Sequence, residues 1–322
     1  MKKLSSHYLQ IIFALFCFIN ITNTKWIKAN GIKNEITLSL IAAGENTFAG
    51  TWGRGIYISK NHGKNWTAAG LNKLNIISLD TVRDSGRKIY LVAGTKYNGI
   101  FISNDCGKSW IKRDKGLKNF TIMSLIPKGN NIFAGTDGGG IFLSTDLGKD
   151  WQQINKGLAN LHIQSLAIKG TDIYTGTQGG GVYVFHNNGK KWNPLNKGLL
   201  NHFVTSLAIV DSDVFAGTYG DGLYIYQNNK NKWIHDGLRK LNIISLSVAK
   251  LKNGLMDIYA GTYGSGFYLS HDSGKNWEQI NYGLKSYNIS SIIKSGQNII
   301  AGTLYGIFYL PMLKTQTINR KY

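Results

Sequence analysis

The stretch Ile132–Phe142 reads IFAGTDGGGIF, and its pattern recurs along the whole chain. Its Ala-Gly-Thr core appears seven times, once as Thr-Gly-Thr, at intervals of 41 or 44 residues. The copies begin at Ala49, Ala93, Ala134, Thr175, Ala216, Ala260 and Ala301. A Gly-Ile-Tyr-like triplet follows each copy after a short glycine-containing segment. A fixed period of this length indicates one repeated supersecondary unit.

A second motif keeps the same period. A Gly-Leu or Gly-Ile pair precedes each Ala-Gly-Thr copy, and a serine follows the glycine by eight residues. These serines, mostly in apolar runs typical of buried strands, are Ser39, Ser78, Ser124, Ser165, Ser206, Ser245 and Ser291. Four short strands per period of about 41 residues are typical of a β-propeller blade. The sequence therefore predicts an all-β, seven-bladed β-propeller of four-stranded blades. Two units are longer, and their extra residues, 82–88 and 248–256, fall between the first and second strands.

A third motif, Ser-x-Asp-x-Gly-x-x-Trp, lies between the expected third and fourth strands. Its best copies are Ser59–Trp66 (with Asn61 in the acidic position), Ser103–Trp110, Ser144–Trp151 and Ser270–Trp277, and weaker copies are Phe185–Trp192 and Tyr226–Trp233. A short acidic or amide side chain can bind local backbone amides, and glycine permits positive φ, so these residues are expected to be structural.

On these residues the chain resembles the Asp-box (BNR) repeat of sialidase-like seven-bladed β-propellers over residues 25–310. The repeat is also similar to the propeller repeats of periplasmic two-component sensors and to photosystem II assembly factors, which are exported single propellers. The resemblance implies the same fold and an exported protein. It does not extend to a signalling role, because no spanning helix or signalling domain follows.

The seventh unit predicts how the ring closes. After Ala301–Thr303 and Gly306–Tyr309 the chain reaches Pro311 without a tryptophan strand, whereas residues 25–28 with Trp26 look like an isolated fourth strand. We therefore expect the N-terminal strand to complete the last blade, which leaves the sheet ring without a free edge. The expected domains are a signal peptide at 1–24, the propeller at 25–312 and a basic tail at 313–322.

Charge and the N-terminus indicate export and suggest anionic partners. Lys2 and Lys3 precede an apolar run at 9–21 and small residues at 22–24, as in a signal peptide that is cleaved after Thr24. A retained anchor is the alternative. The protein is expected in the periplasm or outside the cell.

The chain has 37 basic and 17 acidic residues and a net charge of +20. Such a charge attracts anionic envelope polymers, although scattered lysines also serve solubility.

Candidate ligand-binding residues lie in the glycine turns that follow Ala-Gly-Thr. In a propeller these turns and the Gly-Leu connectors share one face, while the Asp boxes lie on the other. Positions that vary between copies while the scaffold repeats are the candidates: Trp52, Arg54, Lys96, Asp137, Gln178, Tyr219, Asp221, Tyr263 and Tyr305. Aromatic rings beside cations and amides are typical of a protein- or glycan-binding surface. Alternatively, Tyr219 and Tyr263 shield the axial channel and Trp52 packs on its neighbour.

Catalysis has weaker support. Sialidases hold a carboxylate with three arginines, whereas Arg54 is the single arginine in a glycine turn and no Arg-Ile-Pro motif occurs. Other glycosidases need two facing carboxylates, and Asp137 and Asp221 are two blades apart, with Glu35 a third acid near that face. Residues 138–140 lack the Gly-Lys-Ser/Thr ending of a phosphate loop. We expect no cofactor, no metal and no specific nucleic acid, and a non-catalytic binding or assembly module; a glycoside hydrolase is the alternative.

Overall fold

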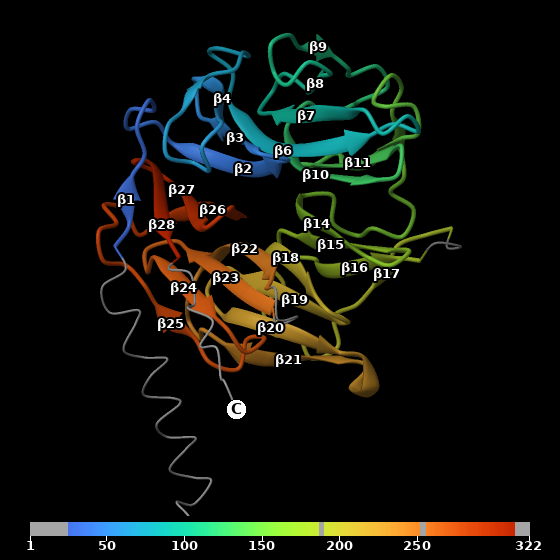
Figure 1. Cartoon of the computed structure of the whole chain (residues 1–322). Coiled ribbons are helices and arrows are strands. Elements are labelled where there is room, and N and C mark those ends of the chain that lie inside the picture. The colour runs from blue at the N-terminus through green and yellow to red at the C-terminus, as the bar shows by residue number, and fades with distance from the viewer. Residues whose placement is uncertain (1–24, 187–189, 252–255, 313–322) are drawn as a thin grey trace, which may run out of the picture.

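Seven four-stranded antiparallel sheets stand in a ring (Figure 1). The computed structural model describes residues 25–186, 190–251 and 256–312. The expected signal peptide and basic tail therefore lie outside the described residues. The all-β, seven-bladed propeller that the repeat predicts is confirmed.

The blades follow one another along the chain. Blade 1 contains β2 (Thr37–Ala43), β3 (Asn46–Thr51), β4 (Gly55–Ser59) and β5 (Thr67–Ala68). Blade 2 contains β6 (Ile76–Arg83), β7 (Ile89–Thr95), β8 (Ile100–Ser103) and β9 (Ile111–Lys112). Blade 3 contains β10 (Ile122–Lys128), β11 (Asn131–Thr136), β12 (Gly140–Ser144) and β13 (Gln152–Gln153). Blade 4 contains β14 (Ile163–Lys169), β15 (Asp172–Thr177), β16 (Gly181–Phe185) and β17 (Asn193–Pro194).

The remaining blades have the same order. Blade 5 contains β18 (Val204–Val210), β19 (Asp213–Thr218), β20 (Gly222–Gln227), a 3-10 turn η1 (Asn228–Lys230) and β21 (Lys232–Gly237). Blade 6 contains β22 (Ile243–Lys250), β23 (Met256–Thr262), β24 (Phe267–Ser270) and β25 (Glu278–Gln279). Blade 7 contains β26 (Ile289–Ser295), β27 (Asn298–Thr303), β28 (Gly306–Pro311) and the N-terminal β1 (Ile27–Lys28).

The N-terminal strand closes the ring, as the sequence predicts. Strand β1 pairs with β28, with Ile27 opposite Tyr309, and Figure 1 shows the blue β1 beside the red β28. Trp26 is 1% exposed, and its Nε1 donates a hydrogen bond of 2.7 Å to the carbonyl oxygen of Ile280 in blade 6. Its ring also meets Phe267 edge-on at 5.1 Å. Blade 7 is therefore completed by pairing across the two ends of the chain.

Tryptophans elsewhere fasten neighbouring blades in the same way. In four blades the indole N–H donates to a backbone carbonyl just after the fourth strand of the preceding blade: Trp110 to Ala69, Trp151 to Arg113, Trp192 to Ile154 and Trp233 to Leu195, at 2.5–3.0 Å. Trp66 instead donates to the Gly63 carbonyl of its own turn at 2.9 Å. The desolvation cost of burying an indole is small when its N–H donates a hydrogen bond to such a carbonyl. Trp26 thus has the same role at the closing blade as its counterparts have elsewhere.

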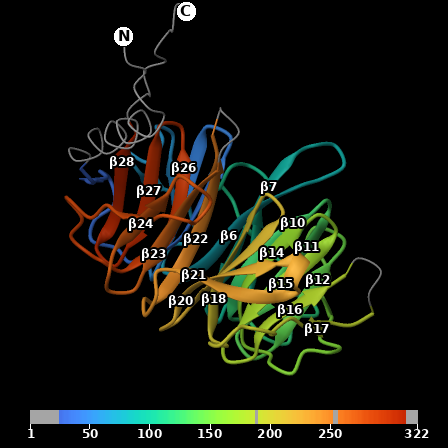
Figure 2. The same cartoon turned by 90° about the horizontal axis from the view of Figure 1, so that it is seen from below.

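The first strands of the blades surround a central axis (Figure 1). Figure 2 shows the same blades from below, with β22 next to β26. Each first strand contacts the first strands on both sides, and β2 contacts β26 across the closure. The seven repeat serines line an axial cavity of about 290 Å³. The glycine of Ala-Gly-Thr lies between that serine and the next blade: a Cβ on Gly94 would fall 2.3 Å from the Ser78 hydroxyl and 2.6 Å from Ile122. Close contact between blades therefore explains why this position must be glycine.

The Ser-x-Asp turns, which join the third and fourth strands at 59–66, 103–110, 144–151 and 270–277, have one hydrogen-bond pattern. In the turn of blade 2, Ser103 Oγ donates to Asp105 at 2.8 Å and accepts from Gly107 N at 2.9 Å. Asp105 also accepts from Ser109, and hydrogen bonds from the side chain and backbone of Ser109 hold the pKa of Asp105 at about 2. These carboxylates satisfy local backbone amides, as expected for a structural role.

Candidate binding face

One edge of the ring, here called the turn face, carries the turns between second and third strands and the connectors into the first strands. The opposite edge, the hairpin face, carries the first-to-second-strand hairpins and the Ser-x-Asp turns. Each turn is closed by the threonine of its Ala-Gly-Thr copy; Thr136 Oγ1, for example, donates to the Gly140 carbonyl at 2.8 Å. All seven threonines make the equivalent bond and are buried.

Backbone hydrogen bonds hold the residue that follows each of these threonines in place. In six blades its N–H donates to a carbonyl in the connector that leads into the first strand of the same blade: Trp52 to Ile36, Lys96 to Asn75, Asp137 to Thr121, Gln178 to His162, Tyr219 to Phe203 and Tyr263 to Asn242. Because the backbone of these positions is fixed by the repeat, their side chains can differ without loss of the fold. The candidates therefore stand on a rigid scaffold, which favours binding with little ordering cost.

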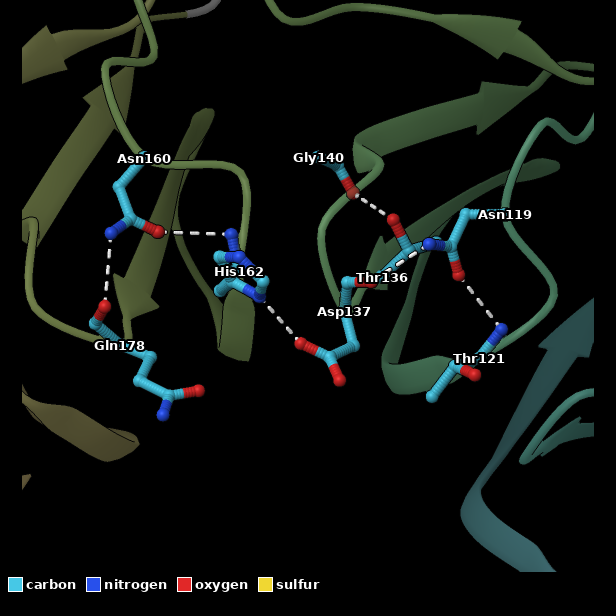
Figure 3. Close-up of polar contacts among 8 residues, drawn as sticks. All are labelled: Asn119, Thr121, Thr136, Asp137, Gly140, Asn160, His162 and Gln178. Atoms are coloured by element: carbon cyan, nitrogen blue, oxygen red, sulfur yellow. Dashed lines mark hydrogen bonds and ion pairs between the residues drawn. The ribbon is translucent and has the colours of Figure 1, made fainter.

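Asparagines brace the turn face in three consecutive blades. Asn119 donates to the Asp137 carbonyl at 2.7 Å and accepts from Thr121 N at 2.9 Å (Figure 3). Asn160 and Asn201 make the same pair of bonds to the next two turns and connectors. The sequence interpretation did not single out these asparagines, although they recur 41 residues apart.

Asp137 and His162 form a pair between blades 3 and 4. Asp137 Oδ1 lies 2.6 Å from His162 Nδ1, and both side chains are about half exposed (Figure 3). The contact with the carboxylate favours a proton on Nδ1, which leaves Nε2 directed away from Asp137. Gln178 follows on the next turn and is exposed. The pair can offer a ligand both a hydrogen-bond donor and an acceptor.

The candidates of blades 1 and 2 form an aromatic and basic group. The Nζ atom of Lys96 lies 4.7 Å from the centre of the Trp52 ring and 5.1 Å from the centre of the Tyr97 ring. Trp52 is 42% exposed and Tyr97 is 67% exposed. The expectation that Trp52 packs on its neighbour is thus met by a cation–π contact that still leaves the ring accessible. Tyr97 was missed because it lies one position beyond Lys96, with a left-handed φ of 76°.

Further tyrosines extend this surface around blades 5 to 7. Tyr219 stacks on Phe203 at 5.4 Å and remains 42% exposed. Tyr263 and Tyr305 are about half exposed, and so is Tyr287 of a connector. Each of these rings can contact a ligand without a change in the backbone.

The carboxylates of this face have separate partners. Glu35 pairs with Arg54 at 3.5 Å. Asp221 accepts a hydrogen bond from the Tyr224 hydroxyl, and burial together with this bond raises the pKa of Tyr224 to about 12. Blade 4 separates Asp137 from Asp221, and the two contact different residues. In the part of the chain that the structure describes, no group of three or more His, Cys, Asp or Glu side chains could hold a metal ion.

Comparison with solved structures finds the same architecture in proteins of low sequence identity. The extracellular domain of the putative one-component system BT4673 from B. thetaiotaomicron is 20% identical, with a TM-score of 0.74 over 90% of this chain and 40% of that one. YCF48 bound to D1 peptide is 15% identical, with a TM-score of 0.70 over 92% of this chain and 97% of that one. The GH74 xyloglucanase from Xanthomonas campestris is 15% identical, with a TM-score of 0.65 over 88% of this chain and 44% of that one.

These likenesses establish the fold. No known family and no curated protein matches the sequence. The chain spans about 40% of the length of the BT4673 domain, so that protein's wider activity does not transfer. Among the described residues, no helix is long and apolar enough to cross a membrane.

Proposed function

We propose that this chain is a non-catalytic binding or assembly module whose turn face binds a protein segment or a glycan. One observation carries the proposal: the turns expose Trp52, Tyr97, Tyr219, Tyr263 and Tyr305 on the same edge, each at least 42% exposed. Exposed aromatic rings on a rigid scaffold commonly mark a recognition surface, because each ring offers a large contact area at low entropic cost.

The chemistry of this face supports a ligand with polar and apolar parts. Trp52, Lys96 and Tyr97 combine ring faces with a cation, while Asp137, His162 and Gln178 supply hydrogen-bond donors and acceptors. A protein segment is the first choice. YCF48, which has a peptide ligand, matches over nearly its full length.

The remaining sequence expectations complete this proposal. The four Ser-x-Asp turns are taken as Asp-box repeats, and residues 1–24 as an export signal that places the propeller in the periplasm or outside the cell. The sensor-type extracellular domain among the similar structures supports this location.

A glycoside hydrolase is the second candidate, favoured by the likeness to the GH74 xyloglucanase. Such an enzyme needs two carboxyl groups roughly 5–9.5 Å apart around the scissile bond. On the turn face Asp137 contacts His162 and Asp221 contacts Tyr224, with blade 4 between them. Turnover of a glycan panel that is abolished by Asp137→Asn or Asp221→Asn would establish the enzyme and overturn the binding module.

The proposal is tested by selecting ligands on the purified protein from a random peptide library and from a glycan array. Binders are then measured against Lys96→Ala and Lys108→Ala. Both variants lose one positive charge from blade 2, but Lys96 lies on the turn face and Lys108 is exposed in the Ser-x-Asp turn of the hairpin face. We expect Lys96→Ala and Trp52→Ala to weaken binding at least roughly tenfold, with Lys108→Ala unchanged. Equal, salt-dependent losses in the two lysine variants would instead indicate adhesion to anionic polymers through net charge.

A further inference from the structure

A second concave site lies on the hairpin face, between blades 4 and 5. It is a cavity of about 320 Å³, at the small end of the size range of ligand pockets. Its walls come from the β14–β15 hairpin, from β16 and β17, and from β20 and η1. The lining residues are Lys169, Asp172, Tyr174, Val184, His186, Leu195, Tyr226, Asn228 and Asn231.

The cavity exists because blade 5 departs from the repeat. In three other blades the glycine of the Ser-x-Asp turn lies against the residue that precedes Ala-Gly-Thr in the blade before it: Gly63 against Ile300, Gly107 against Phe48 and Gly274 against Phe215. The matching residue of blade 4 is Tyr174. Tyr226 replaces the serine in blade 5 and Lys230 replaces the glycine.

Without the serine and glycine the blade 5 turn adopts another shape. Asn228–Lys230 form a 3-10 turn, and Asn231 ends it in the left-handed conformation with φ of 48°. Asn231 accepts a hydrogen bond from the Tyr226 hydroxyl, which holds this turn in place. The space that a glycine fills in the regular blades is thus left open beneath Tyr174.

The lining is rich in groups that both donate and accept hydrogen bonds. Asp172 Oδ2 lies 2.9 Å from His186 Nδ1, which leaves the second carboxylate oxygen and His186 Nε2 for other partners. Asn228 Nδ2 donates to the Ser212 carbonyl at 3.2 Å, which leaves its Oδ1 to accept. Burial raises the pKa of Tyr174 and of Tyr226, so both hydroxyls keep their protons at physiological pH.

The charges of the cavity nearly cancel, although the protein as a whole is strongly basic. Lys169 and Asp172 carry opposite charges, and the other polar lining groups are phenols, amides and an imidazole. Tyr174 is 6% exposed, and among the described residues its hydroxyl has no hydrogen-bond partner. Protein does not fully enclose this hydroxyl, so a ligand or water in the cavity can form a hydrogen bond with it.

We propose that this blade 4–5 cavity binds one neutral sugar residue. Sugar hydroxyls donate and accept in equal measure, as the lining does, and the C–H face of a pyranose packs on phenol rings and on apolar groups such as Val184 and Leu195. An anionic ligand would face Asp172 and a cationic ligand would face Lys169. The site is on the opposite edge from the turn face and does not depend on the function proposed there.

The test uses saturation-transfer NMR on the purified protein with glucose, galactose, mannose and N-acetylglucosamine, and a glycan array that presents the same sugars as chain ends. Asn228→Trp places a bulky side chain in the cavity mouth, and Asn229→Trp, one residue on in the same exposed turn but outside the lining, is its matched control. Tyr174→Phe removes one hydroxyl and keeps the ring. Comparison of binding on the array with binding of the free sugars shows whether the site takes the end of a glycan chain or a monosaccharide.

We expect at least one of these sugars to bind the wild type and Asn229→Trp alike, and to bind Asn228→Trp at least about tenfold more weakly. Tyr174→Phe should weaken binding of the same sugar by about five- to tenfold. Trp52→Ala on the turn face should leave binding of this sugar unchanged. The proposal is overturned if none of the four sugars binds, or if they bind Asn228→Trp as well as Asn229→Trp.

Discussion

Replacing Trp26 by alanine tests how the ring is closed. The side chain is 1% exposed, donates a 2.7 Å hydrogen bond to the Ile280 carbonyl and packs on Phe267. Removing a buried tryptophan typically costs roughly 3–5 kcal/mol of the free energy of unfolding. For a domain of this size each kcal/mol lowers the melting temperature by about 2 °C, which gives a fall of about 6–10 °C.

Two companion variants separate packing from hydrogen bonding. Trp26→Phe keeps an aromatic ring but loses the bond to Ile280, so its loss should be smaller, near 1–2 kcal/mol by the usual cost of an unpaired buried carbonyl. Ile27→Ala alters the adjacent residue of β1, whose side chain is 41% exposed, and should cost less than about 1 kcal/mol. The assay is thermal and urea unfolding followed by circular dichroism. A melting point for Trp26→Ala within about 2 °C of the wild type would refute this account of closure.

Three other substitutions follow from individual contacts. Burial raises the pKa of Asp80 to about 7, so the folded state binds more protons than the unfolded chain between about pH 4 and 7, and stability falls as pH rises through that window. Asp80→Ala introduces the residue that blades 4 and 5 have at the same register position, Ala167 and Ala208. It should stabilise the protein at pH 8 by at most about 4 kcal/mol and flatten the pH dependence of its melting temperature. An unchanged pH dependence would contradict this. The hydrogen bond to buried Asp257 raises the pKa of His271. His271→Ala should therefore lower the free energy of unfolding by roughly 1–3 kcal/mol at pH 5.5, and by less as the pH rises through the raised pKa. An equal effect at pH 9 in urea unfolding would contradict a stabilising interaction between His271 and Asp257. A Cβ on Gly135 would lie 2.4 Å from Ile163 of the next blade, so Gly135→Ala should cost about 1–3 kcal/mol. The control Gly86→Ala, where the nearest atom is 3.3 Å away, should change stability by under about 0.5 kcal/mol in the same assay, and equal effects would refute the contact argument.

Much of the fold could be predicted from the sequence because every blade repeats the same local chemistry. Ala-Gly-Thr occurs seven times, whereas a tryptophan strand follows only six of the copies, and that difference locates the missing strand at Trp26. The candidate positions followed from the same logic, since Thr136 and its counterparts close each turn identically while the next residue varies.

Contacts between blades could not be predicted in this way. The positions of Lys96 over Trp52 and of His162 beside Asp137 depend on the spacing of adjacent blades, which a repeat pattern does not specify. Asp80 was missed because it falls in an apolar strand where the other blades have alanine, isoleucine or, in blade 6, serine. Lys230 in the place of glycine was visible in the sequence, but its consequence, the cavity beneath Tyr174, required the packing of blade 4 against blade 5.

The turn face is the binding surface that we propose. It is tested most directly by hydrogen–deuterium exchange measured with and without a peptide or glycan selected on the purified protein. Binding should slow exchange in the turns at 52–54, 96–98 and 263–265 and in their connectors, and should leave exchange in the Ser-x-Asp turns at 59–66 and 103–110 unchanged. Protection confined to the Ser-x-Asp turns, with the glycine turns exchanging as in the free protein, would contradict it.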